Sequence, residues 1–184
     1  NKILCTGRQV GKSLICSIDA ANYATKNANK VILMIAPTER QAGMLFEKTL
    51  NYLMANYKAL IKTPYTRNVT KTKIELKNNT RILCLPCGTD GTGIRGLTVH
   101  RFYGEESHRI PDAVWSAITP MLLTTGGDMI LLSTPFGRAG FFFDCWKSDN
   151  FKKFHKNSEE VILERPVSAT WTQVQREHAI DFIK

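Results

Sequence analysis

The sequence lacks the cysteine arrangement of a disulfide-stabilised protein. Its 184 residues include five cysteines, an odd number, and only Cys84 and Cys87 lie close together. Their spacing is that of zinc or redox motifs, but no second cysteine pair or histidine pair follows at a suitable distance, so we interpret both as structural. Reduced cysteines throughout are typical of a cytoplasmic protein.

Long hydrophobic runs, a signal peptide, internal repeats and low-complexity segments are also missing. These absences argue against a membrane protein, a secreted protein and a repeat architecture. A chain of this length can bury one core of its own but hardly two. We therefore expect a single soluble domain over residues 1–184.

Acidic residues are scarce relative to basic ones. Aspartate and glutamate number 16 against 25 lysines and arginines, which gives a net charge of +9 at pH 7. Such an excess favours a polyanionic partner or substrate. Charge alone does not distinguish a nucleic acid from a nucleotide or a membrane surface, so the motifs must decide.

The most informative segment is 6–13, with the sequence TGRQVGKS. It is typical of a phosphate-binding loop, in which backbone N–H groups converge on an anion at the start of a helix. Lys12 would reach the terminal phosphates, and the Ser13 hydroxyl would hold Mg²⁺. The usual pattern has glycine six residues before the lysine, whereas here Thr6 occupies that position and Gly7 follows it.

The segments around this loop predict an α/β fold with a mainly parallel central sheet. Apolar residues precede the loop at 3–5, and helical periodicity follows it over 14–24. The runs 31–36 and 129–132 are apolar without alternation, as in strands buried on both faces of a parallel sheet. A further strand is expected over 97–103, although His100 and Arg101 are unusually polar for a central strand.

Helix signals lie between these strands. Thr38 and Gln41 predict a capping box that opens a long helix, and Pro111 opens another that ends at 126–127. Near the carboxyl end we predict a short helix within 136–146, a last strand over 160–163 and a terminal helix over 171–183. The capping box of that last helix would be Thr170 with Gln173.

A β-hairpin is predicted at the edge of the sheet, with strands at 73–77 and 81–85 joined by the polar turn 78–80. Its basic residues include Lys71, Lys73 and Arg81. They could contact the phosphate backbone of DNA, or they could be the solvated charges that protect an edge strand from aggregation. The sequence leaves both open.

Two polar segments follow the hairpin. The glycine-rich stretch 88–96 carries Arg95, and its glycines could admit a ligand or merely connect two elements. Glu105 and Glu106 come where a strand ends, which is where ligands bind in open α/β sheets. One carboxylate could hold the metal of a magnesium nucleotide and the other could orient the attacking water.

Taken together, these motifs resemble the ATPase domain of the large terminase subunit, the motor that packages DNA into the heads of tailed viruses. The likeness spans most of the chain in the expected order. It rests on the segments 7–13, 35–38, 93–96, 105–107 and 132–135, the last followed by Gly137 and Gly140. It implies a P-loop NTPase fold of the additional-strand catalytic-glutamate type.

The resemblance assigns residue roles. The nucleotide would be bound by Gly7, Arg8, Gln9, Val10, Gly11, Lys12 and Ser13, with Arg8 reaching the γ-phosphate and stabilising the transition state together with Lys12. Glu105 would hold the metal with Ser13, and Glu106 would be the catalytic glutamate. Coupling of hydrolysis to movement would fall to Ser133, Thr134 and Pro135, and Arg95 would contact DNA or a neighbouring subunit.

Glu105 departs from the family, which usually has aspartate at the metal position. An alternative register makes Glu105 the base and leaves Gly104 at the metal position. We favour the first register because Ser107 then follows the pair as a small residue often does in the family.

The resemblance also implies cofactors and partners. ATP and Mg²⁺ would be used to move double-stranded DNA, in a homo-oligomeric ring on a capsid portal with the small terminase subunit, in the cytoplasm of the infected host and without a membrane. We expect a fragment: the adenine-binding segment would lie upstream of Asn1, and no nuclease activity is expected. The alternatives are a helicase-like DNA-dependent ATPase and an inactive P-loop interaction module.

Overall fold

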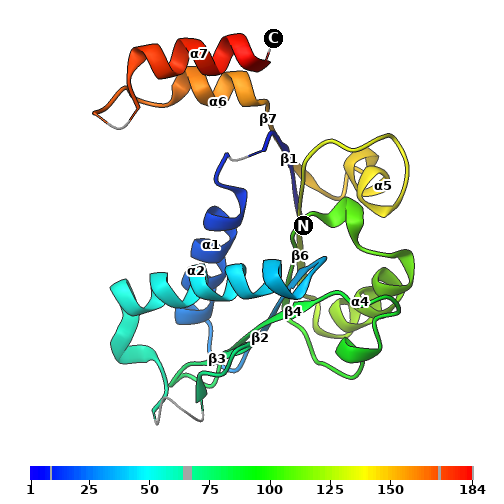
Figure 1. Ribbon diagram of the computed structural model, residues 1–184. Coiled ribbons are helices and arrows are strands. Elements are labelled where there is room, and N and C mark those ends of the chain that lie inside the picture. Colours follow the sequence, from blue (N-terminus) through cyan, green and yellow to red (C-terminus); the bar gives the residue numbers. More distant parts are fainter. Residues whose placement is uncertain (9, 64–67, 170, 184) are drawn as a thin grey trace.

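A computed structural model describes residues 1–8, 10–63, 68–169 and 171–183, and it is built on one seven-stranded sheet (Figure 1). The strand order is β3-β4-β2-β5-β6-β1-β7, and every neighbouring pair is parallel except β3 with β4. The strands are β1 (Lys2–Thr6), β2 (Val31–Ala36), β3 (Lys73–Glu75), β4 (Arg81–Pro86), β5 (Arg101–Gly104), β6 (Asp128–Ser133) and β7 (Lys152–Lys156). The predicted P-loop NTPase type of sheet and the edge hairpin are both present.

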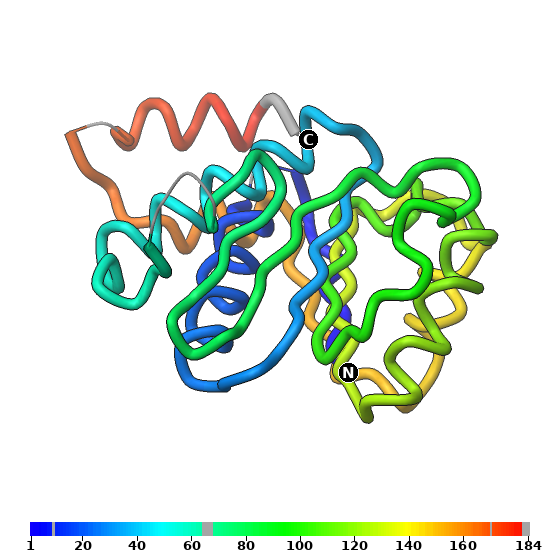
Figure 2. Tube along the Cα trace, turned by 90° about the horizontal axis from the view of Figure 1, so that it is seen from below, coloured from blue at the N-terminus to red at the C-terminus, as the bar shows by residue number. Residues whose placement is uncertain are grey.

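Helices cover both faces of the sheet. They are α1 (Lys12–Lys26), α2 (Glu39–Tyr57), α4 (Asp112–Thr125), α5 (Phe141–Lys147), α6 (Ser158–Glu164) and α7 (Gln173–Ile183), with the short 3₁₀ turns η1 (Lys58–Leu60), η2 (Thr92–Ile94) and η3 (Ser107–Arg109). Figure 2 shows α1 and α2, in blue and cyan, on one side of the sheet, and α4 and α5, in green and yellow, on the other. Each pair packs against its own apolar cluster, so the sheet separates two cores.

The hydrophobic pattern explains the centre of this arrangement. All six residues of β2 are buried, as their unbroken apolar run requires for a strand covered on both faces. Thr38 caps α2 by accepting a hydrogen bond from the backbone N of Gln41, and Gly126 ends α4 in the left-handed conformation. These helix boundaries were predicted from the sequence.

The polar residues next to β5 have specific partners. Arg101 lies 2.6 Å from an Asp128 carboxylate oxygen and 3.4 Å from one of Asp19, with its guanidinium over the Tyr23 ring. The backbone N of Val31 donates to His100 Nδ1 at 3.2 Å. These contacts tie α1 and the starts of β2 and β6 to β5, and they explain the polarity that the strand pattern alone did not.

The prediction was wrong near the carboxyl end. Residues 160–163 lie in α6, because Asn157 and Glu160 form a capping box that starts a helix there. The last strand is instead β7, which pairs with β1 although all of its side chains are exposed. Thr172, paired with Gln175, caps α7, and the predicted cap Thr170 lies outside the described residues.

The described helices include none long and apolar enough to cross a membrane. The five cysteines are free, and the described part of the chain has no cluster of three or more histidine, cysteine or acidic side chains that could hold a metal ion. The structural interpretation of Cys84 and Cys87, both buried, agrees with this.

Candidate active site

A cleft of about 560 Å³ opens at the carboxyl edge of the sheet. The adjacent strands β5, β6 and β1 all end there, so the segments that follow them converge, as expected for a ligand site in an open α/β sheet. The cleft is lined by Arg8, Val10, Gly11, Lys12, Ser13, Leu14, Gln41, Lys48, Glu105, Glu106, Arg109 and Thr134. The predicted phosphate loop, the acid pair and part of the coupling segment are therefore brought together.

The loop between β1 and α1 has the backbone geometry of an anion cradle. Gly11 is the N-cap of α1 in the left-handed conformation (φ 83°), so the amino end of a 15-residue helix faces the cleft. Gly7 is also required, because a Cβ atom there would overlap Ser158 Oγ and lie 2.9 Å from the backbone N of Ser158. The displaced glycine is thus explained by the close approach of α6. Gln9, predicted to bind nucleotide, lies outside the described residues.

Lys12 is buried and folded back onto its own loop. Its Nζ donates hydrogen bonds to the carbonyl oxygens of Gly7 at 2.7 Å and Thr6 at 3.5 Å. Arg8, by contrast, is exposed at the cleft. Two cations of the loop therefore border the cleft, one fixed by the backbone and one able to reach a ligand from solvent.

Glu105 is a buried carboxylate with one unsatisfied oxygen. Ser13 Oγ donates to its Oε1 at 2.7 Å, whereas Oε2 has no hydrogen-bond partner among the described residues. Burial raises the pKa of Glu105 above its ordinary value, and the Ser13 hydrogen bond opposes that shift. A bare carboxylate oxygen beside a serine hydroxyl is the donor set that Mg²⁺ prefers, so the residues present fit that ion.

Glu106 points into the same cleft from a strained backbone. Its φ of 46° and ψ of 48° lie in the left-handed region, which is uncommon for a residue other than glycine and occurs preferentially at functional sites. Thr134 Oγ1 donates to Glu106 Oε2 at 3.3 Å. The two neighbouring glutamates thus face different partners, Glu105 the serine of the loop and Glu106 the end of β6.

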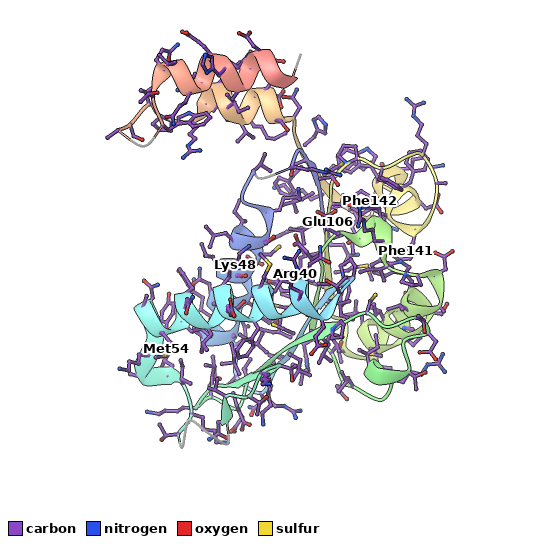
Figure 3. All side chains as sticks on the ribbon, in the orientation of Figure 1. Arg40, Lys48, Met54, Glu106, Phe141 and Phe142 are labelled. Atoms are coloured by element: carbon purple, nitrogen blue, oxygen red, sulfur yellow. The ribbon has the colours of Figure 1, made fainter. Side chains whose placement is uncertain are left out.

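Two basic residues of the cleft were not predicted from the sequence. Lys48 and Gln41 are seven positions apart on α2 and therefore share a helix face; Arg109 is in η3, three positions after Glu106. Figure 3 labels Lys48 and Arg40 on α2 below Glu106. The helical spacing from Gln41 to Lys48 was a usable signal, but it indicates one face without saying what that face covers.

The predicted DNA-contacting residues do not line the cleft. Arg95 is exposed after η2, and Arg81 is exposed on β4. Lys73 lies 3.5 Å from Glu75, and Lys71 borders a separate hollow of about 370 Å³ against α2. Of the coupling segment, Ser133 is buried behind Glu106 and Pro135 borders a small apolar pocket.

Comparison with known families decides the assignment. The family model described as terminase large subunit, T4likevirus-type, N-terminal, matches residues 3–179. The chain belongs to this terminase family. The terminase large subunits of Thermus phage G20c and Thermus virus P23-45 are each 26% identical over 205 residues, covering 89% of this chain. The chain spans about 40% of the length of these curated relatives.

Solved terminase structures share the fold. The large terminase ATPase domain of Thermus phage P74-26 has a TM-score of 0.75 at 23% identity, covering 89% of this chain and 78% of that one. The large terminase of another thermophilic bacteriophage, in complex with ADP, has a TM-score of 0.68 at 15% identity, covering 97% and 44%. At these identities the likeness establishes the fold of a terminase ATPase domain, and residue roles rest on the geometry above.

Proposed function

We propose that this terminase domain hydrolyses ATP with Mg²⁺ and that hydrolysis drives double-stranded DNA into a viral capsid. The single observation that carries the proposal is the cleft in which a phosphate loop, a metal-type carboxylate and a second carboxylate meet at one sheet edge. The family match supports nucleotide as the ligand, and so do the complexes of the thermophilic bacteriophage terminase with ADP and with ATP-γ-S.

In this mechanism the loop binds and orients the phosphates. Lys12 exchanges its contacts with the Gly7 and Thr6 carbonyls for phosphate oxygens, and the N–H groups at the start of α1 donate to the same anion. Arg8 reaches the γ-phosphate from the rim and stabilises the charge that develops on it. Bound Mg²⁺, held by Ser13 and Glu105, neutralises charge on the β- and γ-phosphates.

Glu106 acts as the general base in this proposal. Its carboxylate lies in the cleft without the serine contact that occupies Glu105, so it can accept the proton of the attacking water. Thr134 fixes one carboxylate oxygen through its hydroxyl. The register with Glu105 at the metal and Glu106 as base is therefore the one we propose.

The partners follow from the family. We propose double-stranded DNA as the cargo, a homo-oligomeric ring on the capsid portal, the small terminase subunit as a further partner and the infected cell's cytoplasm as the location. Exposed Arg95 is available to a neighbouring subunit or to DNA. An adenine-binding segment before Asn1 and a nuclease domain after Lys184 belong to the same proposal.

Two variants with different expected defects test the site. Lys12→Ala removes the buried cation of the loop and should abolish both ATP binding and hydrolysis, with Lys26→Ala at the far end of α1 as the matched control. Glu106→Gln should retain ATP binding and lose hydrolysis by roughly 10²- to 10⁴-fold, the usual contribution of a general base. Phosphate release and nucleotide binding are measured in parallel. Normal turnover in Lys12→Ala would refute the proposed site.

A further inference from the structure

His108 is a buried histidine beside the cleft that the proposed mechanism does not use. Only 7% of its side chain is exposed. Its Nδ1 hydrogen-bonds to Ser133 Oγ and lies 3.5 Å from Glu106 Oε2. The same Ser133 hydroxyl oxygen accepts from the backbone N of His108 at 3.5 Å. One ring nitrogen thus touches both the end of β6 and the carboxylate assigned as the base.

Neighbouring contacts define the state of this ring. Arg109 Nε donates to His108 Nε2 at 3.2 Å, so Nε2 is an acceptor and the ring proton is on Nδ1. Burial lowers the pKa of His108; the Glu106 carboxylate opposes this, and the charges of Arg109, Arg8 and Lys12 reinforce it. A neutral ring therefore directs its N–H toward Ser133 and Glu106.

The ring is also held on its face. The Phe136 ring lies with its centroid 4.7 Å from that of His108 at an interplanar angle of 31°. Phe136 follows Ser133 and Thr134 in the same segment, which leaves β6 at the cleft. Side chains of segment 133–136 thus contact His108 at its N–H and its face, and contact Glu106 through Thr134.

We propose that His108 is a positioning residue that joins the Glu106 carboxylate to segment 133–136. The inference rests on the proposed function, since it takes Glu106 as the base. A shift of the segment is then transmitted to the base through two contacts, one from His108 and one from Thr134. Without the ring, Glu106 keeps only the Thr134 contact and loses its fixed orientation, which affects the chemical step more than nucleotide binding.

Steady-state ATP hydrolysis tests the proposal. His108→Ala should lower kcat by about 10- to 100-fold, the cost of a misplaced catalytic group, while KM for ATP changes by less than about twofold. His108→Asn should recover most of kcat, because its amide N–H can take the place of Nδ1–H. The matched control is His178→Ala on the exposed face of α7. ADP binding and thermal unfolding are measured for each variant.

A second variant keeps the test independent of the folding of His108→Ala. Ser133→Ala leaves the ring in place but removes its partner, and combining it with His108→Asn should cost less than the product of the two single effects, because both act on one contact. Wild-type kcat in His108→Ala, or independent effects in this double-variant cycle, overturns the inference alone. Absence of hydrolysis in both the wild type and His178→Ala overturns the proposed function and this inference with it.

Discussion

Ser13 Oγ donates a 2.7 Å hydrogen bond to Glu105 Oε1 across 92 positions of sequence. The contact arises because β1, which leads into Ser13, and β5, which leads into Glu105, both lie beside β6 and end at the same edge. It occupies one carboxylate oxygen and leaves Oε2 buried without a partner among the described residues. A buried, unsatisfied charge is costly, so this geometry favours a cation at that oxygen.

The first prediction concerns the metal requirement. Glu105→Gln removes the charge that attracts Mg²⁺ but keeps the shape of the side chain, so half-maximal hydrolysis should require at least about tenfold more Mg²⁺, the lower end of the cost of losing a site ligand. Hydrolysis is measured against Mg²⁺ at saturating ATP. Glu159→Gln, in the first turn of α6, is the control. Trapped ATP with an unchanged Mg²⁺ requirement would instead select the register in which Glu105 is the base.

The second prediction concerns stability and pH. Burial raises the pKa of Glu105 in the folded state, so the folded chain holds this proton more tightly than the unfolded chain. Stability should therefore fall as pH rises from about 4.3, the pKa of an unperturbed glutamate, through the raised folded value. Without metal, this decline in the free energy of unfolding should be smaller in Glu105→Gln. Urea unfolding at several pH values in EDTA measures it, and parallel curves would contradict the prediction.

Much of the fold was predictable because it is encoded locally. The run 31–36 is apolar throughout and forms the fully buried β2, and the Thr38 cap and the Gly126 stop are short-range signals for α2 and α4. Strand β7 has no such signal: its sequence KKFHK is exposed, and only its pairing with β1 makes it a strand. Tertiary pairing of this kind cannot be inferred from periodicity.

The site was predictable to a similar extent. Residues assigned from contiguous motifs, such as Lys12, Ser13 and the acid pair, do line one cleft. Lys48 and His108 were missed as site residues because nothing in their local sequence indicates function; each borders the site only through the way α2 and η3 pack at the sheet edge. Sequence motifs locate groups that act from a loop, whereas groups that support them from neighbouring elements require the fold.

The third prediction concerns the backbone strain at Glu106. A left-handed conformation costs an L-residue about 1 kcal/mol relative to glycine. Glu106→Gly and Glu106→Ala both remove the carboxylate and its contact with Thr134, so their comparison isolates the backbone. The glycine variant should be more stable to urea unfolding by about 1 kcal/mol, and both should lack hydrolysis. Equal stability would show that the backbone relaxes at this position.

The fourth prediction concerns DNA. If the basic hairpin contacts phosphates, the affinity for double-stranded DNA should fall steeply with salt, and Lys71→Ala and Arg81→Ala should each reduce the slope of log K against log salt by about 1. Lys73→Ala should have a smaller effect, because Glu75 already lies 3.5 Å from that ammonium.

The matched control for these variants is Lys147→Ala, on α5 against the opposite face of the sheet from the α1 and α2 layer. Fluorescence anisotropy with a labelled duplex, titrated at several salt concentrations, gives each slope. Two interpretations of the hairpin then separate cleanly. Phosphate contacts require that Lys71→Ala and Arg81→Ala lower the slope while Lys147→Ala does not; a charged edge strand that only prevents sheet-to-sheet association leaves all the slopes alike and makes the substituted chains aggregate more readily.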